Sequence, residues 1–217
     1  MTPGWYGKLP SLGDFASRRL DQEFIEAWDH WLASGLASWR ENEPSAWLDR
    51  YLSGPSWRFV ITPGVLKSTP GATAWAGVLM PSVDRVGRYF PLTLALPLAR
   101  LPASPAQADT LFSWLHALDD LALDALDEDW SADQLEAELL KLGGPPASAD
   151  AEDDAEGSGL ATLLPELLSA SQGTQVLWIC CDANGQPQWR VTPGLPAEAD
   201  FESLLGAQLH AAEQDLP

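Results

Sequence analysis

The sequence predicts an α/β fold: a single-domain, layered α/β/α sandwich around a mixed, mainly antiparallel sheet of about five strands. Its 217 residues suit one ordinary domain. Hydrophobic residues make up 46% of the chain and include eleven tryptophans, which supply enough apolar surface for a substantial core. Amphipathic helical segments come before, between and after the strand-like segments, and this order favours helices on both faces of one sheet.

The first long helix is predicted over residues 20–39, where large apolar side chains recur at steps of three and four. Asp21 suits its N-cap, and acidic residues in the first turn favour the helix dipole. Pro44 closes this region, and residues 45–52 are predicted to form a second, short helix. We expect the tryptophans of the long helix to contact the sheet. Its apolar stripe consists of Phe24, Trp28, Trp31, Leu32, Leu36 and Trp39.

Three strands are predicted over residues 57–62, 74–80 and 92–98, and each ends at or near a proline. Because the connections between them are short, hairpin-like antiparallel pairing is expected. Pro97 has no N–H group to donate to a neighbouring strand. It therefore limits the third strand to an edge position, or marks the end of that strand.

Three further helices follow from apolar periodicity and capping signals. One covers residues 106–127, and another begins at Ser131. Gln134 lies three residues after Ser131, so the two can form a capping box, and Gly143 ends this helix. A last helix is predicted over residues 197–212.

The segment of residues 143–159 contains glycine, proline, alanine, serine and acidic residues but no aromatic residue. Such a composition cannot bury enough apolar surface to offset ordering, which predicts an exposed, flexible acidic linker or insertion within the domain of residues 1–217. Residues 175–182 are apolar on both faces, as in a strand inside a covered sheet. The Asn184-Gly185 turn then predicts a hairpin partner over residues 186–191.

Charge divides the chain into two halves. Residues 1–100 carry ten Lys/Arg and nine Asp/Glu, whereas residues 101–217 carry two Lys/Arg and 22 Asp/Glu; these give the net charge of −19. An acidic body of this kind repels nucleic acid and anionic membrane surfaces. It is compatible with a basic protein partner, although solubility alone is a simpler explanation.

The sequence indicates a cytoplasmic protein. Its start lacks a basic region followed by an apolar run, and no stretch approaches the roughly 20 apolar residues that span a bilayer. The two cysteines, Cys180 and Cys181, are adjacent within an apolar segment. They form neither a disulfide framework nor a spaced metal motif, which predicts buried structural thiols.

A search for catalytic motifs gives a negative result. The glycine-rich start resembles a phosphate-binding loop only superficially, because Lys8 is followed by Leu9 and the glycine spacing is wrong. The three histidines, His30, His116 and His210, lie alone on predicted helices. The sequence therefore predicts no catalytic residue, no metal site and no cofactor.

Two segments, residues 4–15 and 80–91, mix glycine and proline with aromatic and charged residues. We expect them to be rigid loops that lie side by side at one end of the sheet. An ion pair between them, such as Asp14 with Arg88, would be structural, and it would not exclude a binding role. The residues expected to converge there as a partner-binding patch are Trp5, Tyr6, Lys8, Asp14, Ser82, Asp84 and Arg88.

Four motifs stand in order along the first hundred residues: GWYGKLPSLGDF at 4–15, Trp28-Asp29-x-Trp31-Leu32, Trp57-Arg58-Phe59, and PSVDRVGRYFPL at 81–92. Together they resemble the TagF/ImpM family of type VI secretion-associated proteins. Leu12 departs from the family, which often has a polar or basic residue there. Residues 101–217 resemble the family in layout rather than by motif.

The resemblance implies a three-layer α/β sandwich with longin-like features. It also implies a non-enzymatic, cytoplasmic, post-translational negative regulator of type VI secretion, which acts by protein–protein interaction with the forkhead-associated scaffold protein of that system. The alternative is a hydrolase or anionic-ligand-binding enzyme that uses Lys8, Asp14, Asp84 and Arg88. A deep pocket between the two loops would favour the enzyme, whereas a shallow apolar patch rimmed by charges would favour the regulator.

Overall fold

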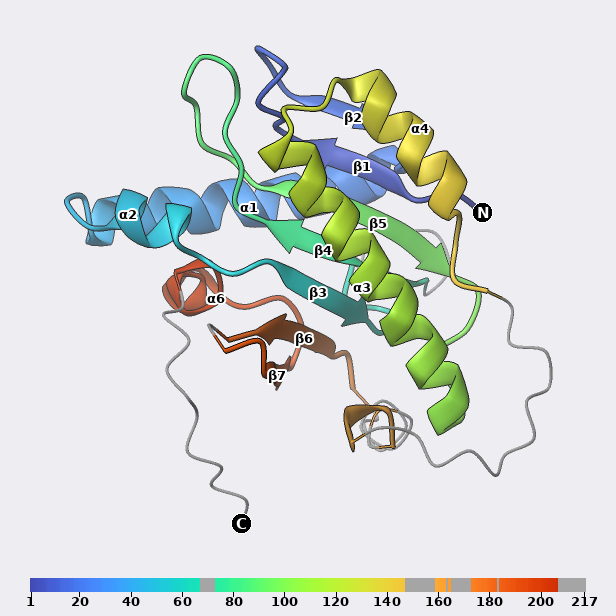
Figure 1. Ribbon diagram of the computed structural model, residues 1–217. Coiled ribbons are helices and arrows are strands. Elements are labelled where there is room, and N and C mark those ends of the chain that lie inside the picture. The colour runs from blue at the N-terminus through green and yellow to red at the C-terminus, as the bar shows by residue number, and fades with distance from the viewer. Residues whose placement is uncertain (67–72, 147–158, 163, 165–172, 183, 207–217) are drawn as a thin grey trace.

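The computed structural model describes residues 1–66, 73–146, 159–162, 164, 173–182 and 184–206 (Figure 1). Its centre is a seven-stranded sheet with the order β2-β1-β5-β4-β3-β6-β7. The strands are β1 (Gly4–Gly7), β2 (Ala16–Arg18), β3 (Trp57–Ile61), β4 (Ala74–Met80), β5 (Leu92–Leu98), β6 (Val176–Cys181) and β7 (Pro187–Thr192). All pairings among these strands are antiparallel. The expected mixed, mainly antiparallel sheet of about five strands is therefore corrected in its strand number to seven, and its pairing among the described residues is antiparallel throughout.

The two strands that sequence analysis missed lie in the glycine-rich N-terminal segment. β1 fits between β2 and β5, with Trp5 opposite Arg18 on one side and Leu94 on the other. Gly7 makes this position possible. Its φ angle is +131°, and a Cβ atom there would lie 2.1 Å from the carbonyl oxygen of Pro91. Only glycine has both the conformational freedom and the small size that this contact requires.

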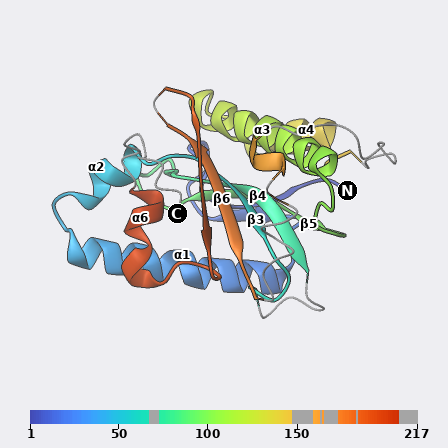
Figure 2. The same ribbon diagram turned by 90° about the horizontal axis from the view of Figure 1, so that it is seen from below.

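Helices cover both faces of the sheet, as the predicted three-layer arrangement requires. Figure 2 shows α1 (Gln22–Asn42) on one face and α3 (Pro105–Asp127) with α4 (Ala132–Leu142) on the other. The other described helical segments are the short α2 (Trp47–Leu52), a helical turn at residues 159–162, the 3-10 turn η1 (Glu198–Asp200) and α6 (Glu202–Leu205). None of the helices in the described part of the chain is long and apolar enough to cross a membrane.

The face under α1 is aromatic. Trp28 is fully buried against Phe59 of β3, and its indole N–H donates to the Thr93 hydroxyl of β5 over 2.9 Å. Trp31 packs against Trp178 of β6, so the predicted contact with the sheet is confirmed for both tryptophans. Trp39, further along α1, packs beside Tyr51 of α2. Gly206, which follows α6, also contacts the Trp39 ring.

The opposite face is aliphatic. Leu111, Leu115 and Leu118 of α3 are buried in one cluster with β-strand side chains. The predicted capping box of α4 is confirmed, because the Ser131 hydroxyl accepts from the Gln134 N–H and the Gln134 side chain accepts from the Ser131 N–H. Separate bonds hold this part of the chain beside the N-terminal strands, because the Ser11 hydroxyl donates to the Trp130 carbonyl oxygen and the Trp5 indole N–H donates to Glu136.

The C-terminal predictions are only partly covered by the described residues. Most of the predicted acidic linker, residues 147–158, lies outside them, and residue 159 belongs to a helical turn that continues to residue 162. β6 lies between β3 and β7, which confirms a strand inside the sheet. The helix predicted over residues 197–212 begins as η1 and α6, and residues 207–212 lie outside the described part.

Candidate functional site

Sheet topology brings the two unusual segments together. Residues 8–15 connect β1 to β2, and residues 81–91 connect β4 to β5. Because β1 and β5 are antiparallel neighbours, with Tyr6 opposite Thr93, the loop that leaves β1 lies beside the loop that enters β5. The two loops emerge at the same end of the sheet (Figure 1). The predicted adjacency is confirmed, and we call this place the two-loop junction.

Asp84 is the centre of the two-loop junction, and it is buried, with 3% of its surface exposed. One carboxylate oxygen accepts from the Lys8 ammonium at 2.6 Å and from Arg88 Nε at 2.7 Å. The other oxygen accepts from the backbone N–H groups of Val86 at 3.0 Å and Arg88 at 2.9 Å. Burial alone would raise the pKa of Asp84, but these hydrogen bonds outweigh it and hold the pKa of that carboxyl well below its usual range.

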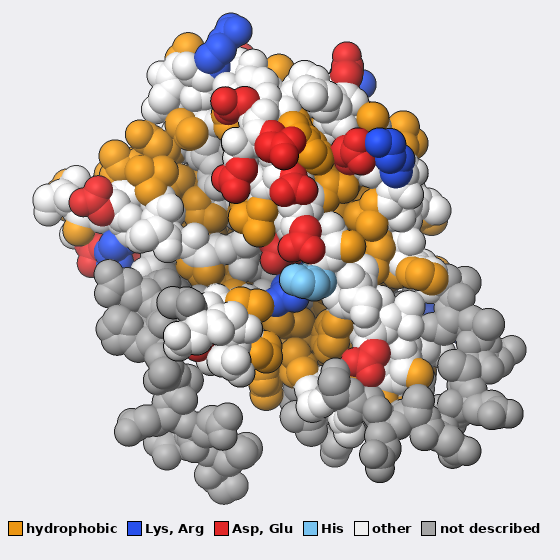
Figure 3. All heavy atoms as spheres, in the orientation of Figure 1, with side chains coloured by type: hydrophobic (Ala, Val, Ile, Leu, Met, Phe, Trp, Pro, Cys, Tyr) orange, Lys and Arg blue, Asp and Glu red, His pale blue; other side chains and the backbone are white. Residues whose placement is uncertain are grey.

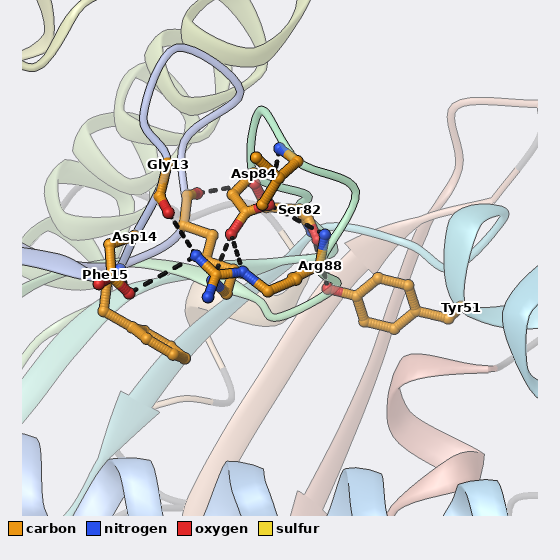
Figure 4. A network of polar contacts seen from close by, with 9 residues as sticks. Gly13, Asp14, Phe15, Tyr51, Ser82, Asp84 and Arg88 are labelled. Carbon is orange, nitrogen blue, oxygen red and sulfur yellow. Dashed lines mark hydrogen bonds and ion pairs between the residues drawn. The ribbon is translucent and has the colours of Figure 1, made fainter.

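Arg88 connects the network to the other loop and to solvent. Its guanidinium donates to the carbonyl oxygen of Gly13 and lies 3.6 Å from the Asp14 carboxylate (Figure 4). The predicted Asp14–Arg88 ion pair is therefore present, although it is the exposed part of a larger buried network. About half of the Arg88 side chain is exposed.

Ser82 links the loops through the backbone. Its hydroxyl donates to the carbonyl oxygen of Lys8 at 2.7 Å. The Tyr51 hydroxyl of α2 donates to the Ser82 carbonyl oxygen and accepts from the Ser82 N–H, both at 2.9 Å. Burial raises the pKa of Tyr51, which keeps this hydroxyl protonated as a donor. Tyr51 could not be predicted as part of the junction from the sequence, since it lies on a separate helix with no local motif.

Three aromatic rings pack against the junction on the side that faces α1. Phe15 stacks on Tyr6 at 5.9 Å between centroids and meets Phe90 edge to face at 4.8 Å. The Lys8 ammonium lies 4.2 Å from the centre of the Phe15 ring. The Tyr6 hydroxyl donates to Asp29 of α1, and burial together with this carboxylate raises the pKa of Tyr6. The Tyr6–Asp29 hydrogen bond thus connects the junction to α1.

Trp5 does not lie at the edge of the patch as expected. It is fully buried on the other face of the sheet, where its indole N–H donates to Glu136 of α4 at 2.5 Å. Alternation explains the difference, because successive residues of a strand point to opposite faces. Tyr6, which faces α1, is also buried, and only the neighbouring Phe15 ring is substantially exposed.

The arrangement leaves few of the predicted site residues free to react. Lys8, Ser82 and Asp84 are all buried and bonded to one another or to the backbone. Two cavities lined by described residues lie elsewhere. One, of about 570 Å³, is near Met1, Leu98 and Gly144, and one of about 390 Å³ is near Arg190. Among the described residues, no group of three or more His, Cys, Asp or Glu side chains is placed to hold a metal ion.

Comparison with known proteins identifies the family. Residues 4–142 match the family described as TagF N-terminal domain, type VI secretion system-associated, which is more than half of the chain. The chain belongs to the TagF family. Both loops of the junction lie within the matched residues.

A solved structure extends the likeness over the whole chain. The crystal structure of PA0076 from Pseudomonas aeruginosa PAO1 is 32% identical, covers 100% of both chains and superposes with a TM-score of 0.76. No curated protein matches the chain. Family membership therefore connects this protein with type VI secretion.

Proposed function

We propose that this protein is a cytoplasmic, post-translational negative regulator of type VI secretion, which acts by binding the forkhead-associated scaffold protein of the system rather than by catalysing a reaction. The observation that carries the proposal is the two-loop junction. It combines a buried charge network with an exposed outer surface, at residues inside the region that matches the TagF family. A fixed frame with an exposed surface suits recognition of a protein partner.

The network supports binding over catalysis. An enzyme that used Lys8, Asp14, Asp84 and Arg88 would need Lys8 and Asp84 to face a substrate. Instead, these two groups face each other, with 3% or less of each residue exposed. The depressed pKa keeps Asp84 charged and paired at neutral pH, which makes it a poor proton acceptor. This chemistry favours a structural role for the buried charges.

The proposal is tested by removing and restoring the protein in its native bacterium. Deletion should increase release of a secreted component of the apparatus, and expression of the wild-type chain should restore repression. Transcript levels of the secretion genes should stay constant, because the action is post-translational. The purified chain should also bind the purified scaffold protein in a calorimetric titration. Unchanged secretion together with absent binding would reject the proposal.

A further inference from the structure

The loop of residues 81–91 ends in a tight turn that holds two side chains outward. The backbone closes it, since Gly87 N–H donates to the Asp84 carbonyl at 2.9 Å and Asp84 N–H donates to the Arg88 carbonyl at 3.0 Å. Gly87 adopts a φ angle of +81°, a conformation that favours glycine. The Asp84 side chain holds the turn from inside. Arg85 and Val86 therefore occupy the projecting positions.

The same turn is fixed to the neighbouring loop. Arg85 N–H donates to the carbonyl oxygen of Leu12 at 2.9 Å. The Arg85 guanidinium extends over Gly13, where an added Cβ atom would lie 3.6 Å from it. The projecting side chains are thus anchored through their backbones, so binding would require little additional ordering of the loop.

Five side chains form the exposed surface of the junction, which we call the loop tip: Asp14, Phe15, Arg85, Val86 and Arg88. Val86 is 64% exposed and Phe15 is 45% exposed, both high values for large apolar side chains. Within the described part of the chain, the Arg85 guanidinium forms no ion pair, whereas Arg88 pairs with Asp14 and shares Asp84 with Lys8. Apolar groups beside guanidinium groups are the composition enriched at the centres of protein interfaces.

The charge of the loop tip is opposite to that of the molecule. The two loops carry Lys8, Arg85 and Arg88 against Asp14 and Asp84, whereas the whole chain carries a net charge of −19. Figure 3 shows basic side chains at the top edge, where the loops project, and acidic side chains gathered over α3. The basic tip attracts an acidic surface, whereas the acidic body repels it. An acidic partner would therefore be directed to the tip.

We infer that the loop tip is the surface that docks the scaffold partner, and that it recognises an acidic segment of that partner containing at least one apolar side chain. The inference rests on the proposed function, because it names the surface through which that function would act. Arg85 and Arg88 would pair with carboxylates, while Val86 and Phe15 would bury the apolar side chain. Asp84 and Lys8 would hold this surface in shape without touching the partner.

Direct binding gives the first test. The variant Arg85→Glu should lower the affinity for the purified scaffold protein by about tenfold or more, because it replaces attraction with repulsion at the centre of the surface. The matched control is Arg100→Glu, an exposed arginine beyond the other end of β5, which should change affinity by about twofold or less. Affinity of the wild-type chain should fall as salt is raised, since exposed charges are screened. Equal affinities for wild type and Arg85→Glu would overturn the inference and leave the proposed function intact.

Crosslinking in the native bacterium tests separately whether the loop tip is the docking surface and whether the scaffold protein is the partner. A photo-crosslinking residue at Val86 should capture the scaffold through an acidic segment, and Arg85→Glu should abolish that product. The same residue at Leu140, which is 61% exposed on α4, is the control. A charge-dependent product with an acidic segment of a different protein would support the loop tip and reject the proposed scaffold. Capture of a second copy of this chain, or capture at Val86 no stronger than at Leu140, would overturn the inference.

Discussion

At the scale of single residues, the buried carboxylate of Asp84 determines the shape of the two-loop junction. It accepts four hydrogen bonds, from one ammonium, one guanidinium and two backbone N–H groups. The donors come from both loops, so this one side chain positions both. Removing it would leave the Lys8 ammonium buried without its partner, which is an unfavourable state for a charged group.

The stability supplied by Asp84 should depend on pH. Its folded-state pKa is depressed below the ordinary value of 3.8, so the stabilisation is fully present above about pH 4 and is lost as the pH falls toward the depressed pKa. The variant Asp84→Asn should therefore be less stable than wild type at pH 7, and the difference should shrink below about pH 4. Urea unfolding of both proteins between neutral and acidic pH measures this difference. Asp14→Asn, at an exposed position, is the control and should cost much less stability at pH 7.

At the scale of elements, α1 joins the core and the junction. Its Trp28 packs on β3 and β5, while its Asp29 accepts a hydrogen bond from Tyr6 beneath the loops. Gly35, on the same helix, lies directly against the ring of Phe201, so the segment after β7 also docks on α1. A single helix therefore connects three parts of the molecule that are distant in sequence.

Trp28→Ala should destabilise the protein by about 3–5 kcal/mol, because it removes a fully buried indole and leaves the Thr93 hydroxyl without its donor. The free energy of unfolding from urea titration measures the effect. Trp189→Ala, on the edge strand β7 with 44% of the side chain exposed, should cost much less. Equal costs for the two variants would contradict the assignment of Trp28 to the core.

The elements differ in how well sequence predicts them. Long helices and the strands β3, β4, β5 and β6 show their periodicity or apolar runs locally, β7 follows from the Asn184-Gly185 turn, and the structure contains all of them. β1 has four residues, two of them glycine, and no local pattern. It is a strand because β5 and β2 lie on either side, a relation that arises only in the folded chain.

The site shows the same division. The residue types at the two loops indicated paired charges, and the adjacency of the loops followed from their chemistry. The choice of Lys8 as a partner of Asp84, and the burial of both, depends on the close approach of Gly7 to Pro91. Trp5 was assigned to the patch because its membership of a strand, and so its direction, was not apparent from four residues.

At the scale of the whole molecule, charge is uneven. All of the excess negative charge belongs to residues 101–217, whereas residues 1–100 are almost neutral. In the described structure, α3 and α4 place part of that charge on one face of the sheet (Figure 3). Repulsion among these carboxylates opposes the compact state.

Salt should therefore stabilise the protein. Raising sodium chloride from about 0.05 M to about 0.5 M shortens the screening length and weakens the repulsion. If screening contributes about 1 kcal/mol, the melting temperature should rise by about 2–4 °C. Differential scanning calorimetry measures the change, and choline chloride should act equally if screening is the cause. A melting temperature that falls with both salts would show that attractive ion pairs dominate.

The strand order has a consequence for how the chain forms during synthesis. The neighbours β3, β4 and β5 leave the ribosome one after another, so they can pair as soon as they appear. β1 precedes the other strands and can pair early with β2, yet its second partner β5 begins only at Leu92. Until β5 has been made, the aromatic side chains of β1 lack their final packing partners. A nascent chain would therefore expose them to chaperones. β6 and β7 are made last. β6 pairs with the remaining edge of β3 and β7 pairs with β6, so the sheet is completed outward from its middle.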